Sequence, residues 1–219
     1  MLLREQLQQA PFTLALSSGF FGFFAHYGLT LALREAGLAP VRVTGASAGA
    51  VVAAVWAHGL SNQEFDLVLK ELKRDRFWDP HIGAGFLKGE KLEDFFREVL
   101  QGHALVMPYA ISTFDIKSRQ TRSFTQGDLP LIMRASCAVP LMFHPVVIDG
   151  RPYWDGGILD KAAVDSVHGR KRDLAGLENQ MKIIPHGLAA VGPNKLALGP
   201  QVVEQAFEHA RKCLNSQSM

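Results

Sequence analysis

Cysteine, net charge and repeated sequence are all scarce in this chain, and each scarcity argues against a class of protein. The only two cysteines, Cys137 and Cys213, lie far apart and form no metal-type spacing. We therefore expect reduced thiols rather than a disulfide framework, which favours the cytoplasm, and neither cysteine has a setting that predicts a nucleophile. A formal net charge of +2 gives no argument for nucleic-acid binding. The sequence contains no internal repeat, low-complexity tract or obvious interdomain linker.

Apolar residues, in contrast, are plentiful. Of the 219 residues, 47% are hydrophobic and 20% are charged, which fits one globular domain with a substantial core. The stretch 12–33 carries no formal charge and is about as long as a membrane span. Serines and glycines between positions 17 and 28 interrupt it, so we predict a buried strand followed by a buried helix. The stretch also lacks a convincing signal-peptide cleavage site and a strongly basic leader.

Short apolar runs alternate with helical patterns along the chain. This order predicts parallel strands in an α/β sheet that helices cover on both faces. Ser61, with Glu64 three residues later, predicts a capping box at the start of a further helix. We predict strands at residues 12–16, 41–44, 109–114, 121–124 and 182–184, and helices at 23–36, 48–58, 88–100, 129–138 and 201–214.

The most informative motif is Gly45-Ala46-Ser47-Ala48-Gly49, a G-x-S-x-G between a strand and a helix. At such a junction a serine lies on a sharp turn, with its hydroxyl exposed near the positive end of the helix dipole. Gly45 and Gly49 suit this turn because a Cβ there would collide with neighbouring backbone. The motif predicts that Ser47 is a nucleophile.

A second motif, Ser17-Ser18-Gly19-Phe20-Phe21-Gly22, follows the first predicted strand. Glycines at the start of a helix let backbone amides converge on an anion. That anion is either a dinucleotide pyrophosphate or the oxyanion formed when a serine attacks an ester. We favour the oxyanion, because Ser17 replaces the first glycine of the dinucleotide fingerprint and no acidic residue closes the second strand.

The third motif is Asp155-Gly156-Gly157. Asp149-Gly150 is typical of a hairpin turn, and the returning strand carries Asp155 to its end. Taken alone, Asp155 followed by glycine is equally typical of an aspartate that only caps a turn.

Together the three motifs resemble the patatin-like phospholipase family, and so does the run from Ala135 to Pro140 that leads through Pro145 to Asp155. The resemblance covers about residues 12–160. It implies a patatin-like three-layer α/β/α sandwich with a mainly parallel central sheet. We expect residues 1–219 to form a single domain, with a C-terminal extension at 161–219.

The resemblance further implies a lipid acyl hydrolase without metal or organic cofactor, acting through a serine–aspartate dyad and an acyl-enzyme. By motif, the nucleophile is Ser47, the base is Asp155, the oxyanion hole is Gly19, Phe20, Phe21 and Gly22, and the supporting glycines are Gly45, Gly49, Gly156 and Gly157. The family commonly has G-G-G-x-[KR]-G in the oxyanion loop. Ser17, Ser18 and Phe21 depart from it, so only backbone donors remain there. Lipid esters are the expected substrates, and no nucleic-acid partner is expected. Peripheral contact at the inner membrane surface and the oligomeric state stay open.

Three alternatives remain. A Ser-His-Asp triad would need a histidine after Asp155, namely His168, His186 or His209. His144 is expected to be structural or pocket-lining, and His26 is expected to be a packed core histidine. A catalytically idle lipid- or partner-binding module would keep the fold, and a dinucleotide enzyme is more distant.

Overall fold

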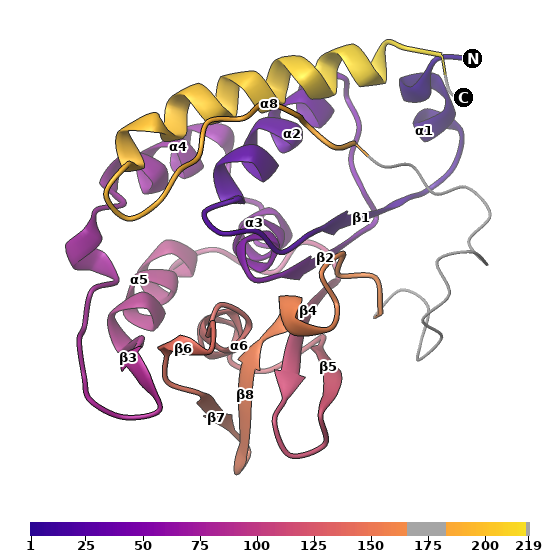
Figure 1. The fold of residues 1–219 in the computed structure, drawn as a ribbon. Coiled ribbons are helices and arrows are strands. Elements are labelled where there is room, and N and C mark those ends of the chain that lie inside the picture. The colour runs from indigo at the N-terminus through magenta and orange to yellow at the C-terminus, as the bar shows by residue number, and fades with distance from the viewer. Residues whose placement is uncertain (166–182, 218–219) are drawn as a thin grey trace.

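The computed structural model describes residues 1–165 and 183–217, which fold around one mixed sheet (Figure 1). The strands are β1 (Thr13–Leu16), β2 (Arg42–Ala46), β4 (Tyr109–Asp115), β5 (Gln120–Phe124), β7 (Val146–Ile148) and β8 (Arg151–Asp155). Their order is β1-β2-β4-β8-β7, with β5 also paired to β4. β1, β2 and β4 are mutually parallel, whereas β5 and β8 run antiparallel to β4. The pairing register nevertheless brings the ends of β2 and β8 together: Ala46 at the end of β2 pairs with Ser112, and Asp155 at the end of β8 pairs with the next residue of β4, Thr113.

Helices pack against both the parallel and the antiparallel strands of this sheet. The described helices are α1 (Leu3–Gln9), α2 (Phe23–Glu35), α3 (Ala48–Ala57), α4 (Asn62–Glu71), α5 (Glu90–Leu100), α6 (Leu129–Ser136) and α8 (Gly199–Leu214). α3 packs against β1, β2 and β4, and every residue of it except Val51 is buried. α6 packs against β4, β7 and β8. α3 and α6 therefore hold the two halves of the sheet together.

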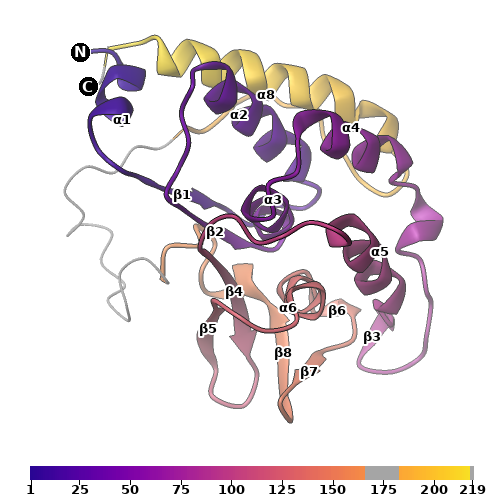
Figure 2. The same ribbon diagram turned by 180° about the vertical axis from the view of Figure 1, so that it is seen from behind.

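α8 lies along α2 on the outside of the molecule, as both views show (Figures 1 and 2). Gly28 permits this close approach, since a Cβ there would lie 2.3 Å from the carbonyl oxygen of Val203. Beyond α8 the chain returns to its beginning. The amide of Leu3 donates to the carbonyl of Ser216 at 3.0 Å, and Leu2 and Gln217 form an antiparallel bridge.

The predicted α/β class is confirmed, and the apolar stretch 12–33 divides into β1 and α2. The capping box is also present, because the Glu64 amide donates to the Ser61 hydroxyl. The strand predicted at 182–184 is wrong: Ile183 and Ile184 are not in a strand, and Lys182 lies outside the described residues. None of the described helices is both long and apolar enough to cross a membrane.

A small second sheet was not predicted. β3 (Gly85–Leu87) pairs in parallel with β6 (Leu141–Phe143). Each strand has three residues, too few for an alternating pattern to show in the sequence. This sheet lies beside α5 and α6 (Figure 1).

Candidate active site

Ser47 occupies the turn between β2 and α3, with φ of 52° and ψ of −119°. A positive φ is unfavourable for any residue with a Cβ and is common where a catalytic side chain is held in a fixed place. Both motif glycines are required by the turn. A Cβ on Gly45 would lie 2.4 Å from the carbonyl oxygen of Gly49, and one on Gly49 would lie 2.0 Å from that of Leu16. The predicted collisions are therefore confirmed.

Asp155 lies at the end of β8 and is almost fully buried. Its Oδ1 accepts a hydrogen bond from the Gly157 amide at 2.7 Å. The following glycines allow close packing: a Cβ on Gly156 would lie 2.0 Å from the Ser112 carbonyl oxygen, and one on Gly157 would lie 2.4 Å from the Ser18 hydroxyl. The loop after Asp155 is thus pressed against β4 and the first glycine loop.

The structure brings Ser47 and Asp155 together. Burial raises the pKa of Asp155, while hydrogen bonding from the Ser47 hydroxyl and the Gly157 amide lowers it. Asp155 Oδ2 is buried and has no hydrogen bond of regular geometry among the described residues. The serine hydroxyl is therefore near the carboxylate but loosely aligned with it, as is common in active sites without substrate.

The first glycine loop is anchored at three points. The Ser18 amide donates to the Lys161 carbonyl at 2.7 Å, a ring nitrogen of His26 lies 2.7 Å from the Ser17 carbonyl oxygen, and the Gly22 amide donates to the Gly19 carbonyl at 2.8 Å. This last bond uses the amide of Gly22, which differs from the expectation that Gly22 would help to bind an oxyanion.

The amides of Gly19, Phe20 and Phe21 make no hydrogen bond within the described part of the chain. Phe21 has φ of 55°, a second strained position in this region. All three residues line the same cavity as Ser47. Three unpaired donors are thus available near the serine, the arrangement that an oxyanion hole requires.

That cavity has a volume of about 520 Å³ and is almost entirely apolar. Ser47 supplies a hydroxyl to its lining. Its apolar walls include Phe77, Leu92, Phe95, Phe96, Val139 and Met142. A cavity of this size and chemistry suits an acyl chain. Phe20 and Phe21 are also part of its lining.

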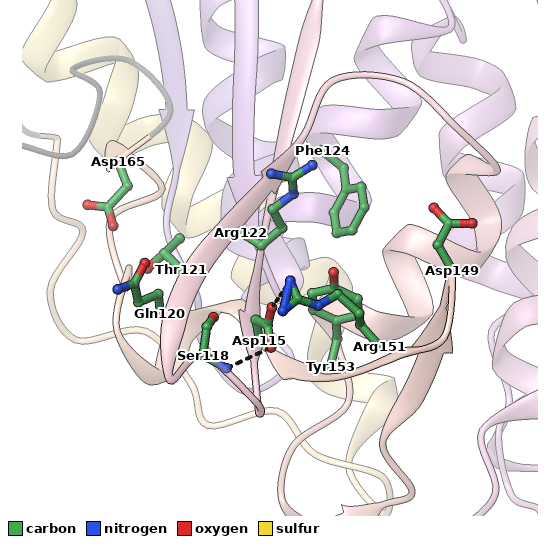
Figure 3. A pocket seen from close by; sticks show the side chains of 10 residues that line it. All are labelled: Asp115, Ser118, Gln120, Thr121, Arg122, Phe124, Asp149, Arg151, Tyr153 and Asp165. Carbon is green, nitrogen blue, oxygen red and sulfur yellow. Dashed lines mark hydrogen bonds and ion pairs between the residues drawn. The ribbon is translucent and has the colours of Figure 1, made fainter.

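A second cavity, of about 610 Å³, is lined mainly by side chains of β4, β5 and β8 (Figure 3). Its lining mixes polar and apolar surface and contains neither Ser47 nor Asp155. Arg151 there lies 3.4 Å from Asp115, and the Ser118 amide donates to the same carboxylate. These contacts stabilise the β4–β5 turn. The larger cavity is therefore not the one that adjoins the motifs.

A buried serine that the sequence did not single out connects Ser47 to the sheet. The Ser47 amide donates to Ser136 Oγ at 2.9 Å, and Ser136 Oγ donates to the Ser112 carbonyl at 2.7 Å. The Ser112 hydroxyl in turn donates to Asp160 Oδ2 at 2.6 Å. Burial raises the pKa of Asp160, against the effect of the Ser112 hydrogen bond. The available signal was the Ala135–Pro140 run, which contains Ser136.

None of the described histidines makes a hydrogen bond or ion pair with Ser47 or Asp155. His26, in α2, is partly buried, and desolvation lowers its pKa. His144 contacts the His81 carbonyl, and His209 contacts Cys213. His168 lies outside the described residues. Within the described residues, no group of three or more histidine, cysteine, aspartate or glutamate side chains is placed to hold a metal ion.

Cys137 also lines the apolar cavity. Burial, with a smaller effect from the Asp155 charge, raises the pKa of its thiol well above the ordinary value. A protonated thiol is a poor nucleophile, so Cys137 does not compete with Ser47.

Comparison with known proteins gives relatives in sequence and in fold. A family model described as patatin-like phospholipase matches residues 14–168. Uncharacterized NTE family proteins of Mycobacterium bovis and Mycobacterium tuberculosis are 38% identical over 168 residues, covering 74% of this chain and 46% of theirs. The chain thus spans about half the length of these relatives. The crystal structure of VipD from Legionella pneumophila has a similar fold, with a TM-score of 0.57 and 14% identity, covering 68% of this chain and 46% of VipD.

Proposed function

The chain belongs to the patatin-like phospholipase family, and from this membership we propose that it hydrolyses carboxylic ester bonds of lipids, with Ser47 as nucleophile and Asp155 as base. Phospholipids and acylglycerols are the proposed substrates. The observation that carries the proposal is the meeting of the Ser47 hydroxyl and the buried Asp155 carboxylate beside an apolar cavity.

In the proposed first half-reaction, Asp155 takes the proton of Ser47 Oγ as that oxygen attacks the acyl carbonyl carbon. The carbonyl π electrons move to oxygen and form a tetrahedral oxyanion. The amides of Gly19, Phe20 and Phe21 stabilise this charge, each by roughly 3 kcal/mol if they resemble donors of other hydrolases. Collapse breaks the ester C–O bond, and the leaving alcohol receives the proton from Asp155.

The second half-reaction repeats these steps with water. Asp155 removes a proton from a water molecule that attacks the acyl-Ser47 ester, and a second oxyanion forms in the same place. Its collapse releases the fatty acid and returns the proton to Ser47. An aspartate is ordinarily a weak base, with a pKa of about 3.9. Burial makes Asp155 a stronger one, because it raises the pKa of the carboxyl.

A fluorophosphonate probe, together with a panel of p-nitrophenyl esters, phospholipids and acylglycerols, tests this assignment. We expect wild-type protein to be labelled and to hydrolyse esters, and Ser47→Ala and Asp155→Asn to lose both properties. Ser123→Ala is the matched control, because Ser123 lies on β5 and its hydroxyl has no hydrogen bond in the described chain. Hydrolysis that survives in Ser47→Ala would refute the assignment.

The same panel separates the dyad from a triad. Single alanine substitutions of His168, His186 and His209 should each leave substantial activity. Loss of activity in one folded histidine variant would replace the dyad with a triad.

A catalytically idle lipid-binding module is the second candidate. The departures at Ser17, Ser18 and Phe21, and the loose alignment of Ser47 with Asp155, favour it. Folded protein that binds lipid but resists the fluorophosphonate would support this candidate.

We also propose that residues 1–219 act as one domain, which the packing of α8 on α2 supports. We propose further that the protein is located in the cytoplasm and contacts the inner membrane surface peripherally.

A further inference from the structure

A hairpin formed by residues 79–88 protrudes beside the Ser47 cavity. Pro80 and Leu87 form an antiparallel bridge, and the amide of His81 donates to the Phe86 carbonyl at 3.0 Å. At the turn of this hairpin Ile82 is 99% exposed. The hairpin is not loose, because β3 within it pairs with β6 and a ring nitrogen of His144 lies 3.2 Å from the His81 carbonyl oxygen. The Ile82 side chain is thus exposed to solvent at the turn of an ordered hairpin.

Ile82 is not part of the cavity lining, but three other exposed apolar side chains are: Phe20 at 59%, Phe86 at 57% and Leu141 at 84%. We call these three residues and Ile82 the apolar rim. They come from the first glycine loop, the hairpin and β6, which are far apart in the sequence. Clusters of this kind on a protein surface usually mark a place of contact.

Leu141 adds a second observation. Its φ is 68°, in the left-handed region that a branched aliphatic residue rarely adopts. Packing in a core does not explain this conformation, because the side chain is mostly exposed. Strain that serves no internal contact is characteristic of a functional surface.

A cation adjoins the apolar rim. The Arg74 guanidinium lies 3.7 Å from the centre of the Trp78 ring, and that ring contacts Phe86. Arg74 makes no ion pair with any residue that the structure describes, and its hydrogen bond goes to the neutral amide of Asn194. Its charge therefore remains available to an anion outside the chain.

We propose that the apolar rim docks the protein on the surface of an anionic lipid bilayer, with Arg74 among the phosphate groups. Exposed aromatic and aliphatic side chains beside a cation are the composition that binds at a bilayer interface. Because the rim borders the Ser47 cavity, docking brings the cavity mouth to the bilayer, where an acyl chain enters without crossing water. The benefit to catalysis rests on the proposed function, whereas the docking does not need it.

Vesicle sedimentation tests the docking in a Ser47→Ala background, so that no lipid is hydrolysed. The vesicles contain phosphatidylcholine alone or mixed with phosphatidylglycerol. Ile82→Asp should weaken binding to the mixed vesicles about tenfold or more, because a charge replaces an inserted apolar group. Val41→Asp is the matched control: Val41 is also exposed, but it precedes β2, at the end of that strand opposite Ser47. It should bind as the parent does.

Arg74→Gln tests the charge. Binding to the mixed vesicles should fall about fivefold, and binding to phosphatidylcholine alone should not change. Equal binding by Ile82→Asp and the parent would overturn the proposal. It would also be overturned if neither type of vesicle bound and the protein formed a dimer that Ile82→Asp dissociated, since the rim would then contact a second copy.

A soluble ester separates this proposal from the proposed function. With Ser47 intact, Ile82→Asp should hydrolyse p-nitrophenyl butyrate at the wild-type rate but lose most hydrolysis of vesicle phospholipid. Equal loss on both substrates would overturn the docking role of Ile82. If the wild type hydrolyses no ester but Ile82→Asp still impairs vesicle binding, the docking stands and the proposed hydrolase function fails.

Discussion

Replacing Ser136 with alanine tests whether one buried hydroxyl holds the Ser47 turn in its strained form. Ser136 is fully buried, and its Oγ accepts from the Ser47 amide at 2.9 Å and donates to the Ser112 carbonyl at 2.7 Å. Alanine removes this bridge and changes the side-chain volume little. The Ser47 amide would then be left without its partner.

The size of the effect follows from these two contacts. A buried donor that loses its partner costs about 1–3 kcal/mol, so we expect the free energy of unfolding to fall by about 2 kcal/mol. For a chain of this length, Tm falls by about 2–4 °C per kcal/mol. The positive φ of Ser47, with its ψ of −119°, costs on the order of 1–3 kcal/mol, similar to the stabilisation that is lost. The turn should therefore relax, and a displacement near 1 Å lowers kcat up to about 100-fold.

The assay is the rate of fluorophosphonate labelling, together with kcat and KM on a soluble ester, well below the unfolding temperature of every variant. Ser136→Ala should label roughly 10- to 100-fold more slowly than the wild type, with KM little changed. Ser123→Ala should match the wild type in rate. A Ser136→Ala protein with a lowered Tm but the wild-type labelling rate would refute the positioning role and leave only a structural one.

Three other predictions concern the same site. Gly49→Ala should yield little soluble folded protein, measured by expression and thermal unfolding, because its Cβ would meet the backbone of Leu16. The kcat/KM should fall as pH drops through the raised pKa of Asp155, above the ordinary value of about 3.9, because the base must be ionised. A carboxyl whose folded pKa is raised favours folding below its unfolded pKa, and this contribution is lost as pH rises through the folded pKa. Asp155→Asn should therefore raise Tm at neutral pH while abolishing activity, and an unchanged Tm would contradict the burial argument. Val51→Phe, one helical turn after Ser47 on the cavity wall, should reduce hydrolysis of a palmitoyl ester at least about tenfold more than that of an acetyl ester.

Much of the fold and the centre of the site were predictable because their signals are local. The strand before Ser47 and the helix after it differ in periodicity, and glycines mark the turn between them. Gly45 and Gly49 are required by contacts made within a few residues or with the adjacent β1. The turn at Asp149-Gly150, where both residues have positive φ, was likewise evident from two letters of sequence.

The rest depends on contacts between distant segments. Ser136 touches Ser47 across 89 positions of sequence, and Asp160 touches Ser112 across 48. No periodicity or spacing connects such pairs. The use of the Gly22 amide within its own turn depends on the conformation of Phe21, a residue whose type does not predict a positive φ. The pairing of β3 with β6 was unpredictable for the same reason, because each of these strands is defined by its hydrogen bonds to the other, distant strand.

The bridge between Leu2 and Gln217 has a mechanical consequence. Leu2 and Gln217 are neighbours in space, so a pulling force applied to both would act at one place on the molecule. The contacts between the two terminal segments would then break one after another rather than all at once. The β-bridge between Leu2 and Gln217 and the Leu3–Ser216 hydrogen bond would break first, and α8 would then separate from α2.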